Sequence, residues 1–156
     1  MSKTSIVDWH GIYSLSFCIT KYTKLQNFQF KQLHRILPVN SLLYKCGTQE
    51  TKENLLHLFW NCNLVQNFWL NAKNVLLISG ITLPLNAREI TLGISERNIE
   101  NQFTVNNILF ILKCYIYRCR CKGEIPHLHR GLQYLKLYQN RKKILLLHIL
   151  QKEIAN

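Results

Sequence analysis

The chain has 156 residues, enough for one domain with a helical tail, and its 47% share of apolar residues predicts a folded protein. Twenty lysines and arginines against eight acids give a net charge of +12, which indicates a polyanionic partner. Asp8 is the only aspartate and the seven glutamates are scattered. Two-metal polymerase and nuclease chemistry needs clustered carboxylates and is therefore excluded.

The chain begins with polar residues, and its longest apolar runs, 108–112 and 145–147, are far shorter than the roughly 20 residues that cross a bilayer. We therefore expect no membrane span. The six cysteines are expected to be reduced, because a secreted disulfide framework would need a signal peptide. The expected location is intracellular, in the nucleus or the cytoplasm.

In chain order, residues 8–15 predict a short helical turn. A helix is expected from Thr23, which can cap it, until Pro38 stops it, because apolar residues recur at helical spacing between them. Residues 41–45 predict another short helical piece. Gly47 then permits a backbone reversal in a polar, turn-like stretch.

Helical periodicity returns in the rest of the chain. It covers residues 53–60, 63–79 and 104–121, and a last helix begins near His127. Gly80 is placed to end the second of these helices. Between 81 and 100 the pattern is weak: residues 81–83 look extended, and residues 89–92 fit a strand or a helix.

The spacing Cys46-x10-His57-x4-Cys62 is typical of a zinc ligand set, since zinc prefers sulfur and imidazole donors. Structural zinc usually takes four ligands, and no cysteine stands three residues before Cys46 to complete a Cys-x2-Cys pair. His34 or Cys18 could supply a fourth donor, although the spacing gives no reason to choose either. On spacing alone, two buried cysteines and a partly satisfied histidine are the favoured interpretation, because structural zinc prefers a closed set of four ligands.

The residues around this motif resemble a known family. Residues 25–45 look like the segment that precedes the zinc-binding domain of reverse transcriptases in LINE-type (non-LTR) retrotransposons. Residues 50–62, which end in His57-Leu-Phe-Trp-Asn-Cys62, are similar to that family's Glu-Thr-x-x-His-Leu-Phe-Trp-x-Cys core, with extra residues before the histidine. The aromatic run at 65–69 matches the one that follows this core.

The resemblance implies a zinc site with one ligand missing. In that family the ligands are Cys-x2-Cys, a spacer and then His-x4-Cys. Cys46 matches the second cysteine, His57 the histidine and Cys62 the last cysteine, whereas the first cysteine has no counterpart. Zinc is therefore a candidate cofactor with an incomplete ligand set. The family's polymerase and endonuclease motifs are absent, so the resemblance implies a non-catalytic fragment and not an enzyme.

Positive charge is concentrated in residues 113–152, where ten basic side chains face one acid, Glu124. Such a stretch can neutralise phosphates, and its tyrosines can stack on unpaired bases. The alternative is a solvated basic face that keeps an apolar helix in solution. The candidate nucleic-acid-binding residues are Arg118, Arg120, Lys122, Arg130, Lys136, Arg141, Lys142 and Lys143.

The sequence as a whole predicts a mainly α fold, a small helical domain with a degenerate Cys/His zinc-knuckle segment and a basic helical tail. Residues 1–80 form the reverse-transcriptase zinc-binding-like region, and residues 81–156 form a basic helical region packed on it as one unit. The expected function is sequence-tolerant binding of RNA or DNA, with no small-molecule substrate. Two alternatives are a structural or protein-interaction module and a non-functional retroelement relic.

Overall fold

The computed structural model describes residues 7–39, 54–95 and 102–138, and within these ranges it contains helices and no strand. The mainly α fold expected from the sequence is confirmed. The helices are α1 (Trp9–Ile19), α2 (Thr23–Leu33), η1 (His57–Asn61), α4 (Asn63–Ile78), α5 (Ala87–Leu92), α6 (Gln102–Lys122) and α7 (Leu128–Tyr138).

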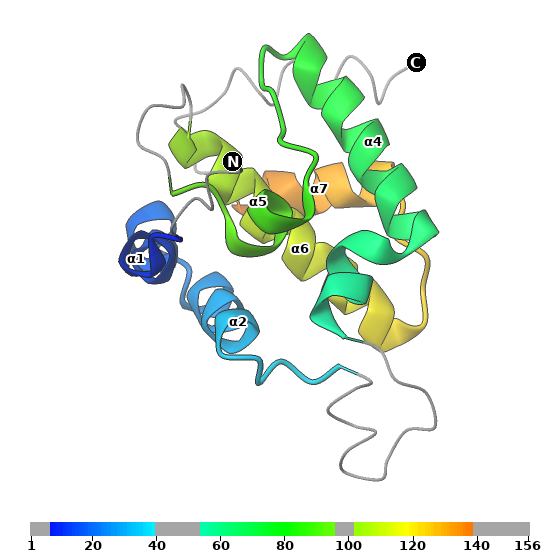
Figure 1. Cartoon of the computed structure of the whole chain (residues 1–156). Helices are drawn as coiled ribbons and strands as arrows, with labels where there is room; N and C mark the ends of the chain where they lie inside the picture. The colour runs from blue at the N-terminus through cyan, green and yellow to red at the C-terminus, as the bar shows by residue number, and fades with distance from the viewer. Residues whose placement is uncertain (1–6, 40–53, 96–101, 139–156) are drawn as a thin grey trace, which may run out of the picture.

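The apolar helix α6 runs through the centre of the molecule (Figure 1). From Ile108 to Ile116 every side chain of α6 is buried, because α1, α2, η1 and α7 all pack against it. Helices α1 and α2 lie on one side of the molecule and α4 lies on the other (Figure 1). The described parts of the two predicted regions therefore share one hydrophobic core.

Several predicted boundaries differ from the observed ones. Helix α1 continues to Ile19, four residues beyond the predicted turn at 8–15. Helix α2 ends at Leu33 and does not reach Pro38, because Arg35 takes a left-handed conformation with φ of 56°. The backbone N–H groups of Arg35 and Ile36 then bond back to the carbonyls of Gln32 and Lys31, at 3.1 and 2.9 Å.

This early ending of α2 is a C-terminal cap in which glycine is the usual left-handed residue and arginine is rare. It turns the chain so that Leu37 and Val39 return to the core, where both are buried. The undecided segment 89–92 is part of helix α5, which Asn86 caps by accepting a hydrogen bond from the Glu89 N–H at 2.8 Å. The short helical piece expected at 41–45 lies outside the described residues.

A lysine lies inside the apolar helix α6. Lys113 is fully buried, and its side-chain nitrogen donates to the side-chain oxygen of Gln29 at 3.0 Å and to the carbonyl of Thr91 at 2.8 Å. The side-chain nitrogen of Gln32 donates to the same carbonyl. This polar network links α2, α5 and α6 across the core, and the sequence interpretation had treated the helix as mostly apolar.

Candidate nucleic-acid interface

A basic groove lies between α2 and α6 and encloses about 740 Å³. Lys24, Asn27 and Lys31 line it from α2, at spacings that put all three on one face of that helix. Tyr117 and Arg118 line it from α6. The remaining lining residues are Phe28, Leu37, Pro38, Cys114, Cys121 and Tyr134.

The groove combines three cations, and none of the described residues that line it is acidic. Lys24, Lys31 and Arg118 are all exposed to solvent, so they can meet a ligand without first being uncovered. The Arg118 guanidinium lies 5.8 Å from the ring centre of Tyr134, which limits where this charge can move. Phosphate groups are the chemistry that such an arrangement favours.

The tyrosines of the groove stay neutral. Burial raises the pKa of Tyr117 and of Tyr134 above the ordinary value of 10.0, so neither hydroxyl adds negative charge near physiological pH. The Tyr117 hydroxyl donates to the Pro38 carbonyl at 3.0 Å and thereby ties the end of α2 to α6. Tyr134 is only 6% exposed, so its ring forms part of the floor and is not a surface on which a base can stack.

The aromatic surface that a base could reach is on Tyr22 and not on the buried Tyr134. Tyr22, which precedes α2, is 39% exposed and meets the ring of Tyr138 edge-on at 5.3 Å. Tyr138 in turn lies 5.1 Å from Tyr134, so the three rings form a chain leading to the groove lining. An unpaired base can stack on the outermost of these rings.

The structure distributes the predicted basic residues over several surfaces. Arg118 lines the groove, whereas Arg120, two positions later on α6, lines a separate pocket beside Cys62. Residues two apart on a helix face different sides, which explains the division. Lys122 is exposed at the end of α6, and Arg130 lies 3.7 Å from the Glu124 carboxylate.

Four further predicted residues are placed differently or lie outside the described residues. Lys136 is half-buried on α7, and Arg141, Lys142 and Lys143 lie outside the described residues. The sequence interpretation missed Lys24 and Lys31. Their signal is the seven-residue spacing along the polar face of α2, which the charge density of the C-terminal quarter outweighs.

The structure describes two of the three predicted zinc ligands, His57 and Cys62. His57 begins the wide helical turn η1 and Cys62 follows it, joined by a hydrogen bond from the Cys62 N–H to the His57 carbonyl at 3.2 Å. His57 is exposed, while Cys62 packs in part against the core. Cys46 lies outside the described residues, and within them no three His, Cys, Asp or Glu side chains come together as a metal site would require. The described donors alone therefore do not fit a structural zinc ion.

Searches against protein-family models, curated proteins and solved structures gave no match to this chain. Across the ranges 7–39, 54–95 and 102–138, none of the helices has the length and apolar character needed to span a bilayer.

Proposed function

We propose that this chain binds single-stranded RNA or DNA without sequence preference along the groove between α2 and α6. The observation that carries the proposal is the cluster of Lys24, Lys31 and Arg118, three exposed cations from two helices around a groove whose described lining holds no acid. Their charges neutralise successive phosphates of a strand. The chain's excess of positive charge and its resemblance to the C-terminal part of retrotransposon reverse transcriptases support the same class of partner.

The binding is sequence-tolerant because the groove offers charge and ring surfaces but few groups that can read a base edge. Asn27 is the amide in its lining. Phosphate contacts position a strand and carry no sequence information. The proposed role is therefore to hold a strand, with no catalytic step assigned to the chain.

Replacing Lys24, Lys31 and Arg118 together with glutamine tests this proposal. The logarithm of affinity for single-stranded nucleic acid changes by about 0.7 for each neutralised phosphate per tenfold change in salt. We expect the triple variant to lose most of its affinity at low salt, and the salt slope to fall by about 2. Fluorescence anisotropy with a labelled RNA of mixed sequence, repeated over a salt series, measures both quantities.

A matched control removes the same charge elsewhere. Lys73, Arg88 and Arg130 lie outside the groove lining, so replacing these three with glutamine should change the affinity and its salt slope much less. Equal losses in the two triple variants would mean that net charge alone attracts the strand. No detectable binding by the parent protein at low salt would favour a protein-interaction module or a relic over nucleic-acid binding.

A second prediction concerns zinc. Because structural zinc takes four donors and the Cys46, His57 and Cys62 set has three, we expect purified protein to hold clearly substoichiometric zinc and to melt at the same temperature with and without a chelator. Metal analysis and thermal melts measure these. Stoichiometric zinc that is lost in Cys62→Ser, but kept in the exposed-cysteine control Cys121→Ser, would show instead that a fourth donor completes the site.

A further inference from the structure

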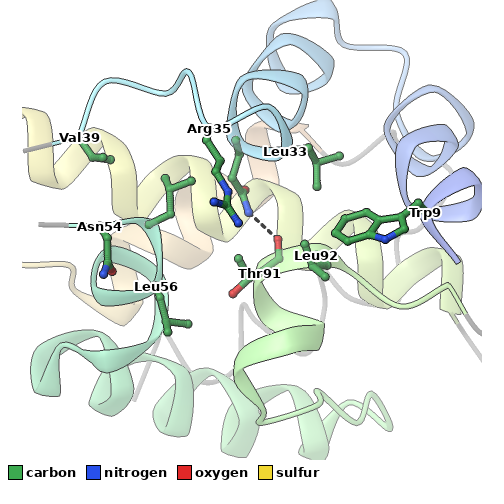
Figure 2. A pocket seen from close by; sticks show the side chains of 10 residues that line it. Trp9, Leu33, Arg35, Val39, Asn54, Leu56, Thr91 and Leu92 are labelled. Atoms are coloured by element: carbon green, nitrogen blue, oxygen red, sulfur yellow. Dashed lines mark hydrogen bonds between the residues drawn. The ribbon is translucent and has the colours of Figure 1, made fainter. Parts of the chain in front are cut away.

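A second cavity, separate from the basic groove, lies where α2, the start of η1 and α5 meet, and it encloses about 480 Å³. Its walls are mainly apolar, and four polar residues interrupt them (Figure 2). The apolar lining residues are Trp9, Leu33, Val39, Leu55, Leu56 and Leu92. Cavities of this size and composition are typical of sites for small organic molecules.

One polar group in this cavity has an unused hydrogen-bonding atom. Gln32 is 2% exposed, and among the described residues its side-chain oxygen has no hydrogen-bond partner. The orientation of this amide is fixed, because its nitrogen donates to the Thr91 carbonyl and a flipped amide would set two oxygens against each other. A buried acceptor without a donor is rare in native proteins, and an N–H or O–H group of a ligand that reaches this oxygen would satisfy it.

A second polar group supplies positive charge. The side chain of Arg35 points into the cavity towards Thr91 (Figure 2). Arg35 also has the left-handed backbone conformation, with φ of 56°, at a position where glycine or asparagine would be less strained. Strained residues of this kind cluster at ligand sites. No carboxylate lines the cavity within the described residues.

We propose that this cavity binds a small organic anion. The acidic group of the ligand pairs with Arg35, a donor group bonds to the Gln32 oxygen, and the apolar body lies against Leu33 and Leu92. The planar guanidinium matches both carboxylate and phosphate. The exposed indole of Trp9 lies at the rim of the cavity and covers a bound ring from that side (Figure 2). This site uses different residues from the groove and does not depend on nucleic-acid binding.

The probes are the ortho, meta and para isomers of hydroxyphenylacetate, which carry an acid, a donor and an apolar ring in one small molecule. Titration is followed by the NMR signals of the Trp9 indole and the Gln32 side-chain amide. We expect saturable shifts of both signals with at least one isomer. Tolylacetate, in which a methyl group replaces the donor, should bind about threefold or more weakly, and hydroxyphenylethanol, which lacks the charge, about tenfold or more weakly.

The same titration with phenyl phosphate distinguishes the two kinds of anion. Tighter binding of phenyl phosphate assigns the site to phosphate esters, and tighter binding of an arylacetate assigns it to carboxylates. Arg35→Asn is the matching variant, because asparagine tolerates the left-handed conformation and carries no charge. We expect it to keep or raise the melting temperature and to weaken the best probe by about tenfold or more.

Two results would overturn the proposal: no saturable shift with any of these anions, or equal affinity in Arg35→Asn and the parent protein. The control variant Lys73→Gln should bind the best probe as the parent does, because Lys73 lines neither this cavity nor the basic groove. A loss in Lys73→Gln equal to the loss in Arg35→Asn would likewise contradict a specific site, since it would show a general response to charge.

Discussion

Replacing Trp69 with alanine is expected to lower the free energy of unfolding by about 3–5 kcal/mol. Trp69 is completely buried in α4, and its ring packs edge-on against Phe68 at 5.6 Å between centres. The indole N–H also donates to the Phe59 carbonyl at 2.9 Å, which ties α4 to the wide turn η1. The substitution removes the packed ring and deprives a buried carbonyl of this donor. Urea denaturation measures the change.

The control for this prediction is Trp9→Ala, because the Trp9 side chain is 51% exposed. Its cost should stay within about 0.5 kcal/mol, as is usual for a surface substitution. Trp69→Phe separates the two contributions, since it restores most of the ring but not the donor. A loss below about 1 kcal/mol in Trp69→Ala would contradict the burial of this side chain in the core.

The main helices could be predicted from the sequence because they depend on local patterns. Apolar residues at helical spacing predicted a helix at 104–121, and α6 covers these residues. The end of α2 could not be predicted from its own residues. It depends on a left-handed Arg35, which is stabilised only because Leu37 and Val39 reach the core behind it. Apolar periodicity shows which face of a helix is buried. It does not show where tertiary contacts end the helix before its apolar pattern stops.

The candidate site was predicted only in part, for the same physical reason. Charge density along the chain identified Arg118, but the groove also takes Lys24 and Lys31 from a helix more than 80 residues earlier. Similarly, the partner of Lys113 in the core is Gln29, 84 residues away. A single sequence does not show which of its polar residues meet across a fold. The His57 and Cys62 pair remains a prediction for zinc, because Cys46 lies outside the described residues.

The other large effect expected is a dependence of stability on pH caused by Lys113. Burial lowers the pKa of this lysine from 10.5 to about 7. Between pH 7 and 9 the unfolded chain therefore carries a proton on Lys113 that the folded protein has lost. Stability rises with pH when the unfolded state binds more protons, so we expect a gain of up to about 1.4 kcal/mol per pH unit across this window. Urea denaturation at several pH values measures it.

The gain should end above pH 9 because other buried groups act in the opposite direction. Burial raises the pKa of Cys114 above 9.0 and that of Tyr115 to about 12, so the folded protein keeps protons that the unfolded chain releases. Lys113→Met keeps the apolar length of the side chain and removes its proton, and we expect it to flatten the profile between pH 7 and 9. The exposed-lysine control Lys24→Met should keep the parent's slope. A flat profile in the parent, or an unchanged slope in Lys113→Met, would show that the Lys113 amine is not the group that titrates. The network of Gln29, Lys113 and Thr91 would then not hold a neutral lysine in the core.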